Sequence, residues 1–406
     1  MTTTSLNSLN RVAAESEMPS QAVVVVRRIA FVGLALTVGA VQFSIAVAEI
    51  MAGFTLAAWI AMLAIEHRRP AAPAWMTPLL FYGGWTLLSA AFSPDPASSF
   101  TDCKQLVLLL LVPMTYDIVD EDSAVLLSTV ILAAAAVSAV IGIGQYSILH
   151  YDNLGQRPRS TLNLYMTFSG LMMLALTLAV ARVLFMTRSR IWPALVIPAL
   201  SVVLALTLSR NAWTGACAAV ALLLMIRDLR LAAVLPVIAA LFFASAPAPV
   251  LQRFYSSFDL HDLTISDRFA MQRAGVQIIR AHPVFGVGPN MVERVYPQYR
   301  DAGAIEETVS HLHNVPLQIA AERGLPALGI WLWFVAAVSA GAIALFRPSP
   351  REGPLRFLAA ATLASTVAMV VAGMTEHNFG DSEFQMLFLV LITLPFAVAR
   401  SPSTAH

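Results

Sequence analysis

The segment that decides the fold is "IAFVGLALTVGAVQFSIAVAEIMAGFTLAAWIAMLAIE", residues 29–66. It carries almost no charge and is long enough for two helices, since about 20 apolar residues cross a bilayer core. A tight turn near residues 42–44 would separate the two helices. The segment therefore predicts a pair of transmembrane helices.

The composition of the whole chain points to the same class of protein. Of 406 residues, 58% are hydrophobic and only 12% are charged, whereas an ordinary soluble domain is about 25% charged. The net charge of +1 leaves no basic surface for nucleic acid. Cys103 and Cys217 lie in or at apolar segments, so we expect no disulfide framework. We expect an integral membrane protein that contacts membrane lipids and no nucleic acid.

Similar apolar runs continue along the chain and predict an all-α polytopic membrane protein with about 12 transmembrane helices. The runs after the first pair are 74–92, 104–119, 123–148, 162–186, 191–208, 211–227, 230–247, 314–346, 355–374 and 383–399. The predicted organisation is a disordered cytoplasmic tail at 1–28, nine spans within 29–247, a loop subdomain at 248–313, three spans within 314–400 and a cytoplasmic tail at 401–406.

The distribution of basic residues orients this arrangement. With the N-terminus inside, 14 arginines fall on the cytoplasmic side, and the short outer loops hold only Lys104, Arg157, Arg159 and Arg210, as the positive-inside rule requires. The long loop 248–313 then faces outward. Loops of this length are usually functional or disordered, and its apolar content favours a folded subdomain with two short helices within 267–300, interrupted by Pro283 and "GVGPN".

Several polar groups fall on the outer face and are candidates for one shared cavity. They are Arg157 and Arg159 before span six, Arg210 between spans seven and eight, Arg268 and Arg273 in the loop, His311, His313 and Asn314 before span ten, and Glu376, His377 and Asp381 between the last two spans. Guanidinium groups bind phosphate bidentately and keep their charge, so this set suits a lipid-linked diphosphate. Other interpretations are open: Arg210 could snorkel to lipid headgroups, and the remaining arginines could lie on solvated surfaces, paired with acids such as Asp267.

His313 is the candidate for proton transfer, because an imidazole accepts a proton near neutral pH. The alternative is a helix start capped by Ser310 with both histidines in water. No third metal ligand occurs at a typical spacing, and the acidic residues 120–122 fall on the cytoplasmic side. "GVGPN" lacks the βαβ context of a dinucleotide fingerprint. We therefore expect neither a metal ion nor another cofactor.

Three motifs resemble those of the bacterial O-antigen ligases and the wider O-antigen ligase/polymerase superfamily. "HNVPLQIAAERGLPA", residues 313–327, is similar to the family pattern of His-Asn, nine residues, then Gly-x-x-Gly, with Ala327 in place of the second glycine. "HPVFGVGPNMVERVYPQY", residues 282–299, resembles its P-x-x-G-x-G loop segment. "LSRNAWTG", residues 208–215, resembles its Ser-Arg segment. The resemblance covers roughly residues 140–400.

The resemblance implies a metal-independent, inverting GT-C-type glycosyltransferase of the bacterial inner membrane, with its active site on the periplasmic side. Such ligases move O-antigen from undecaprenyl diphosphate to a sugar hydroxyl of lipid A–core in lipopolysaccharide biosynthesis. By this analogy His313 is the general base, and Arg210 and Arg268 bind the diphosphate and stabilise its developing charge. The implied substrate-binding residues are Arg157, Arg159, Arg273, His311, Asn314 and His377.

Three other functions fit parts of the pattern. A polymerase of the same superfamily would extend the lipid-linked glycan, but polymerases tend to have two large outer loops, and here the loop at 149–161 is short. A protein O-oligosaccharyltransferase is usually longer at its C-terminus. A transporter or flippase for a lipid-linked sugar would need charged groups in mid-membrane, where few occur.

Overall fold

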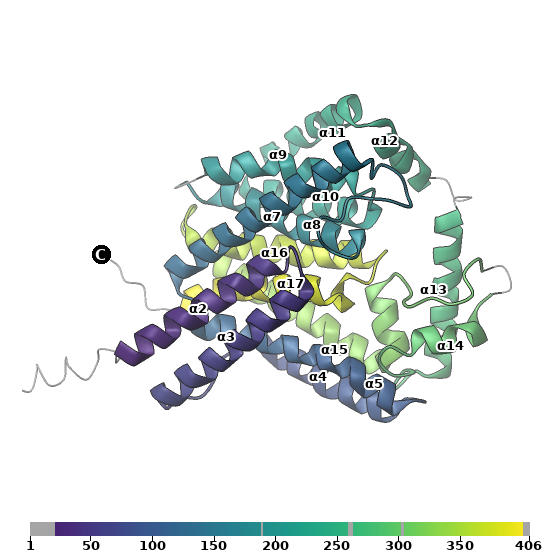
Figure 1. The fold of residues 1–406 in the computed structure, drawn as a ribbon, viewed down its shortest axis with the longest axis horizontal. Helices are drawn as coiled ribbons and strands as arrows, with labels where there is room; N and C mark the ends of the chain where they lie inside the picture. Colours follow the sequence, from purple (N-terminus) through teal and green to yellow (C-terminus); the bar gives the residue numbers. More distant parts are fainter. Residues whose placement is uncertain (1–20, 188–189, 259–262, 302–303, 401–406) are drawn as a thin grey trace, which may run out of the picture.

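A computed structural model describes residues 21–187, 190–258, 263–301 and 304–400, and these residues form helices and loops without a strand (Figure 1). The terminal segments 1–20 and 401–406, parts of the predicted cytoplasmic tails, lie outside the described residues. The first half contains α2 (Gln21–Ala40), α3 (Ile45–Glu66), α4 (Met76–Ala91), α5 (Pro96–Asp102), the 3₁₀ helix η1 (Cys103–Leu110), α6 (Leu111–Ile118), α7 (Glu121–Leu149) and α8 (Tyr165–Phe185).

In the second half, a segment of short helices and α13 (Leu263–Ala281) lies between α11 (Val234–Ser245) and the last three long helices. The helices of this half are α9 (Ile191–Leu206), α10 (Arg210–Arg227), η2 (Leu229–Ala233), α11, α12 (Ala248–Tyr255), η3 (Ser256–Phe258), α13, α14 (Val292–Tyr299), α15 (Val315–Phe346), α16 (Pro354–Gly373), η4 (Asn378–Gly380) and α17 (Ser382–Arg400). Every apolar run predicted from the sequence coincides with helical structure.

Eight helical stretches in the described part of the chain are long and apolar enough to cross a membrane: α2, α3, the continuous stretch Pro96–Ile118, α7, α8, α15, α16 and α17. The remaining four predicted runs form shorter helices. α4 and α9 have 16 residues each, about 24 Å at 1.5 Å per residue, which is less than the roughly 30 Å hydrocarbon core. The protein is a polytopic membrane protein, and the number twelve stays a prediction.

The helices pack around a centre formed by α8, α16 and α17, which are buried over most of their length. Large apolar side chains face outward on the peripheral helices, such as Ile29 and Leu36 on α2, Phe54 on α3 and Leu195 on α9. A soluble monomer rarely exposes so much contiguous apolar surface. This outer surface suits contact with lipid.

The first helix begins earlier than the sequence pattern predicts. Residues 21–28, which we assigned to a disordered tail, are helical and form the start of α2. The apolar run Val23–Val26 extends the helix, and the Arg27 guanidinium lies 3.4 Å from the Glu66 carboxylate at the end of α3. This ion pair joins Arg27 to the neighbouring helix and favours a helical start to α2.

The bundle has two chemically distinct ends, which α17 connects. At one end, the buried carboxylate of Asp117 accepts hydrogen bonds from Trp59, Arg68 and Arg400, the last at 3.0 Å. The opposite end, near the start of α17, holds His311, His313 and His377, and we call it the histidine end. Figure 1 shows α13 and α14 beyond the helices at one side of the bundle. The bundle therefore presents its histidines toward the loop subdomain.

Candidate active site

The site begins at the N-terminus of α15, where Asn314 caps the helix. Its side-chain oxygen accepts a hydrogen bond from the Leu317 amide at 2.9 Å, and its Nδ2 donates to the Met374 carbonyl at 2.8 Å. Asparagine is a preferred N-cap residue. We expected Asn314 to bind substrate, but its amide instead caps α15 and joins it to the end of α16. Asn314 thus fixes where the preceding histidines lie.

The helix breaks at Gly324, which has φ 81° and ψ 170°. The loop at 283–288 enters this break: the Val287 amide donates to the Ala321 carbonyl at 3.0 Å, and the Gly288 amide donates to the Glu322 carbonyl at 2.8 Å. Pro326 has no N–H to serve the Glu322 carbonyl, so the loop supplies that donor. A side chain at Gly324 would meet the Val284 carbonyl oxygen at 1.9 Å. The break thus anchors the loop subdomain beside the histidines.

His311 and His313 converge on the carboxylate of Glu376, between α16 and α17. Nδ1 of His313 lies 3.0 Å and Nε2 of His311 lies 3.2 Å from the same oxygen, Oε1. The guanidinium of Arg268, from α13, lies 3.6 Å from Oε2. His313 has a positive φ of 48°, a conformation that costs energy in most residues and is concentrated at functional sites. Three segments far apart in sequence thereby form one charged cluster.

The charges around Glu376 keep it ionised. Its side chain is buried, and burial by itself would raise its pKa, but hydrogen bonds from His311 and His313 and the positive charge of Arg268 lower the pKa below its usual range. A carboxylate only accepts hydrogen bonds, so the Nδ1–H of His313 donates to it. The lone pair on Nε2 of His313 is then available to accept a proton, as a general base requires.

His377 lies beside this cluster and has a different character. Burial lowers its pKa to about 3, and the neighbouring His311 adds to this effect. Its ring centre lies 5.6 Å from that of His311. His377 is therefore neutral near pH 7 and acts on the site through packing against His311.

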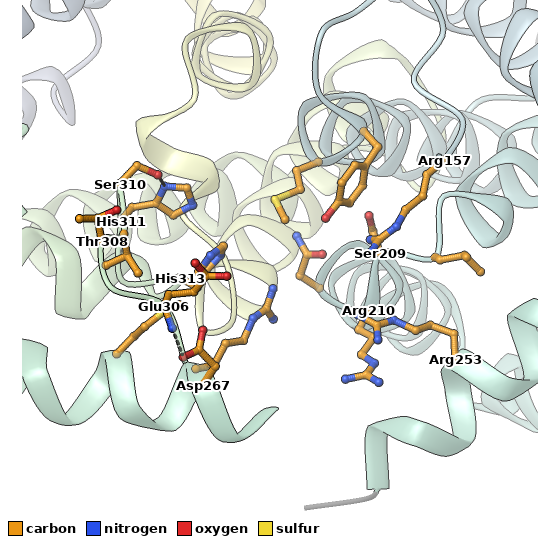
Figure 2. Close-up of a pocket in the computed structure, with 17 residues that line it drawn as sticks. Arg157, Ser209, Arg210, Arg253, Asp267, Glu306, Thr308, Ser310, His311 and His313 are labelled. Atoms are coloured by element: carbon orange, nitrogen blue, oxygen red, sulfur yellow. Dashed lines mark hydrogen bonds between the residues drawn. The ribbon is translucent and has the colours of Figure 1, made fainter. Parts of the chain in front are cut away.

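An arginine-rich cavity of about 330 Å³ opens beside the histidines. Figure 2 shows Arg157, Arg210 and Arg253 on one side of this cavity and His311 and His313 on the other. Arg268 also lines the cavity, with Asp267 and Glu306 as the acidic side chains. The cavity therefore has four guanidinium groups against two carboxylates, and it can hold an anion such as a diphosphate.

The arginines of this cavity repel one another. Burial lowers the pKa of Arg157, and the charges of Arg268 and Arg210 contribute in the same direction. The Arg157 guanidinium lies over the ring of Tyr165, 4.1 Å from its centroid, a favourable cation–π arrangement. An anion bound among these groups would relieve their mutual repulsion.

Comparison with known protein families matches residues 195–332 to the model described as O-Antigen ligase. This segment is similar to the O-antigen ligase family, and the match supports a place for the chain in the O-antigen ligase/polymerase superfamily. The matched residues run from α9 to the middle of α15 and include Arg210, Arg268 and His313. No curated protein sequence matches the chain.

The structure brings together five of the nine residues that were selected from the sequence. Arg157, Arg210, Arg268, His311 and His313 all line the arginine-rich cavity. Arg159 and Arg273 do not line it. Arg159 is exposed and donates to the Asn163 carbonyl, and the exposed Arg273 pairs with Asp301. Asn314 caps α15, and His377 packs behind His311.

Two residues of this region were not selected as site residues from the sequence. Arg253, on α12, is buried and lines the cavity. The only signal for it was an arginine in a short amphipathic segment. Glu376 was noted as a polar residue on the same face, but its contact with the histidines, 63 residues away from His313, depends on the packing of α15 against α16.

The histidine end also offers a set of potential metal ligands. One ligand atom each from His311, His313 and Glu376 lie within 4.8 Å of one another. The spacing in the sequence predicts no third ligand, whereas the structure places Glu376 beside the two histidines. Two histidines and a glutamate are a known zinc ligand set, but here the positive charge of Arg268 already faces the carboxylate. The arrangement is better suited to an ionised glutamate that orients imidazole groups.

Proposed function

We propose that the protein is a GT-C-type, inverting glycosyltransferase that moves O-antigen from undecaprenyl diphosphate to a sugar hydroxyl of lipid A–core at the periplasmic face of the inner membrane. The observation that supports this most directly is the His313–Glu376 pair, which faces an arginine-rich cavity partly formed by the O-antigen ligase domain. Anion-binding groups and a proton acceptor are the two components that such a transfer needs.

The proposed reaction is a direct displacement. The acceptor hydroxyl oxygen attacks the anomeric carbon of the donor glycan while Nε2 of His313 takes the hydroxyl proton. The bond between the anomeric carbon and the phosphate oxygen breaks, and undecaprenyl diphosphate leaves with the electron pair. Glu376, held at Nδ1, stabilises the imidazolium that forms, as a buried carboxylate does beside a catalytic histidine. A single displacement inverts the configuration at the anomeric carbon.

The arginines would act on the leaving group. Arg157, Arg210, Arg253 and Arg268 line the cavity, and they would bind the diphosphate and neutralise the charge that develops as it leaves. Guanidinium groups suit this task because their planar fork matches phosphate oxygens. The diphosphate would lie against the arginine side of the cavity, with the anomeric carbon toward the histidines.

A superfamily polymerase is the second candidate, since it would use the same donor chemistry with a lipid-linked glycan as acceptor. The short connection between α7 and α8, residues 150–164, favours the ligase, because polymerases tend to have two large outer loops. A lipid-linked sugar transporter is a weaker candidate, because it would not need a histidine held by a buried carboxylate.

The test is a deletion of the gene in its host, followed by gel analysis of lipopolysaccharide. Loss of all long chains on lipid A–core, with lipid-linked polymer retained, supports the ligase. Single repeat units on the core support the polymerase. Purified protein, incubated with undecaprenyl diphosphate-linked O-antigen and rough lipopolysaccharide, should then form the ligated product. No product in that assay would reject the ligase proposal.

A further inference from the structure

A second cavity, of about 190 Å³, shares Ser310 and His311 with the arginine-rich cavity. Its walls come from α4, η1, the first turns of α15 and the segment between α16 and α17. η1 is a 3₁₀ helix of eight residues, although 3₁₀ runs longer than three or four residues are uncommon and mark functional or strained positions. We name this space the amide cavity, after Gln105, Gln318, Gln385 and Asn290, which line it.

The charge of the amide cavity excludes a diphosphate as its ligand. Its one guanidinium belongs to Arg323, which lies 2.5 Å from the Glu322 carboxylate and 4.0 Å from that of Asp102. Two carboxylates therefore surround a cation that is already paired. A diphosphate would be repelled here, whereas the four arginines of the first cavity attract it. The amide cavity suits an uncharged polar group.

Its hydrogen-bonding groups point to hydroxyls. Both ends of the Gln318 amide are engaged, since its oxygen accepts from the Leu312 amide and its nitrogen donates to Glu322, both at 2.8 Å. Gln385 differs: it is 7% exposed, and its Oε1 accepts no hydrogen bond from the described residues. The buried Nε of Arg323 likewise has no acceptor among the described residues. A buried polar group normally has a partner, and a ligand that both donates and accepts would serve these two.

Aromatic side chains complete the cavity wall. Tyr82 and Phe379 line it, with ring centroids 6.2 Å apart in an edge-to-face arrangement. Amide groups beside aromatic rings match the two surfaces of a sugar, hydroxyls at its edge and C–H bonds on its face. A purely apolar ligand would leave the Gln385 oxygen unsatisfied, at a free-energy cost.

We propose that the amide cavity binds the uncharged acceptor sugar and presents its hydroxyl across His311 to the donor in the arginine-rich cavity. This inference rests on the proposed glycosyl transfer. The ring centre of His311 lies 4.4 Å from that of His313, so a hydroxyl entering past His311 reaches the proposed base directly. Donor and acceptor then occupy separate cavities that meet at the histidine pair.

Binding to the purified full-length protein tests this assignment. The probes are rough lipopolysaccharide, a lipid-linked single repeat unit and sugar-free undecaprenyl diphosphate. Gln385→Leu keeps the side-chain volume and removes the amide, and it should weaken binding of an acceptor probe about tenfold, the loss of one buried hydrogen bond. The Kd for undecaprenyl diphosphate should stay unchanged. The acceptor probe affected, rough lipopolysaccharide or repeat unit, identifies the source of the sugar.

Gln42→Leu is the matched control. Gln42 is buried in the turn between α2 and α3, and its side-chain amide has no hydrogen-bond partner among the described residues. Gln42 does not line the amide cavity. The variant should change no Kd. Gln105→Ala repeats the test if Gln385→Leu does not fold, because the Gln105 amide makes only one long hydrogen bond among the described residues, 3.4 Å to the Gly380 carbonyl.

The outcomes separate this inference from the function on which it rests. Unchanged acceptor binding in both cavity variants, or weakened binding of undecaprenyl diphosphate instead, would overturn the acceptor assignment. Arg210→Ala should weaken only undecaprenyl diphosphate binding. If that variant binds the diphosphate normally, the proposed donor site is wrong, while the effect of Gln385→Leu on the acceptor probes still decides the role of the amide cavity.

Discussion

Nδ1 of His313 lies 3.0 Å from Oε1 of Glu376, and this contact joins the start of α15 to the segment after α16. Because the lowered pKa of Glu376 keeps it ionised, the contact fixes which nitrogen of His313 bears the proton. His311 shares the same carboxylate oxygen. The pair is the chemical centre of the site, and the first prediction concerns it.

His313→Ala should lower the turnover of glycan transfer by about 10²–10⁴-fold, the usual contribution of a general base. Binding of undecaprenyl diphosphate should be retained, since the arginines remain. The measurement is the initial rate in a purified assay, with donor binding measured in parallel. His282→Ala is the matched control, because His282 is exposed just after α13 and its ring hydrogen-bonds only to Tyr299 among the described residues.

A double variant shows whether Glu376 acts through His313. Glu376→Gln alone should slow transfer, because a neutral amide stabilises the imidazolium less well. Added to His313→Ala, it should cause little further loss, since residues that act as one unit are not additive. Full activity of His313→Ala would remove the histidine from the mechanism.

Arg210→Lys should reduce transfer by about 10–100-fold, somewhat less than the 10²–10³-fold typical for removing a charge-stabilising donor. Lysine keeps the charge but loses the planar fork that binds two phosphate oxygens. Arg273→Lys is the control, since Arg273 is exposed and pairs with Asp301 outside the cavity. Wild-type rates in the Arg210 variant would instead favour an arginine that contacts only lipid headgroups.

Removal of metal ions should leave transfer unchanged. His311, His313 and Glu376 offer three ligand atoms close together, but Arg268 already supplies positive charge to the carboxylate. The measurement is the transfer rate after dialysis against EDTA. A loss of activity that Zn²⁺ restores would show that the cluster is a metal site and that our mechanism assigns the wrong role to Glu376.

Acid should destabilise the protein through His377. Its folded pKa of about 3 lies below the ordinary value of about 6.5, so the unfolded chain binds the extra proton first. The stabilising contribution is fully present above pH 6.5 and is lost as the pH falls toward 3, by at most about 1.4 kcal/mol per pH unit.

Thermal unfolding at pH 7.5 and pH 5 measures this effect. The His377→Gln variant, which cannot titrate, should lose less stability between these two values than the wild type. Glu376 does not interfere, because its contribution is lost only below the ordinary glutamate pKa of about 4.3. Identical pH dependence in the two proteins would contradict the assignment of a neutral, buried His377.

Gly324→Ala should destabilise the protein by about 1–3 kcal/mol or more, because the residue has a positive φ and its new Cβ would collide with the Val284 carbonyl. Gly329→Ala, five residues later in α15, is the control: its Cβ would meet no atom within 4 Å, and alanine favours the helix. Thermal unfolding of both variants measures the difference. Equal stability would show that the break at Gly324 is not constrained.

The sequence predicted the helices well, because an apolar run long enough to span a membrane has few other structures available to it. It also predicted that Arg210, Arg268 and His313 share one face. It did not predict the break in α15. That break depends on Pro326, which leaves the Glu322 carbonyl without a donor, and on Gly288, 34 residues earlier than Glu322, whose amide replaces it.

The same limit applies to the site. The spacing to Gly324 selected His313 over His311 as the proposed base, but the structure places both histidines against Glu376. Which arginines line the cavity depends on how α12 and α13 return to the bundle, so Arg253 was missed, and Arg159 and Arg273 lie outside the cavity. These contacts connect distant segments, and no local pattern in the sequence specifies them.

The entry of the 283–288 loop into the break at Gly324 changes how the chain should be divided for chimaeras. Leu312 and Ala321 belong to the same hydrophobic cluster as Met271 and Tyr296 of the loop subdomain. The first turns of α15 are therefore packed as part of the loop, although they are continuous with a membrane helix. An exchange of specificity between relatives should transplant residues 263–324 as one cassette, since a junction at 313 would cut through a folded core.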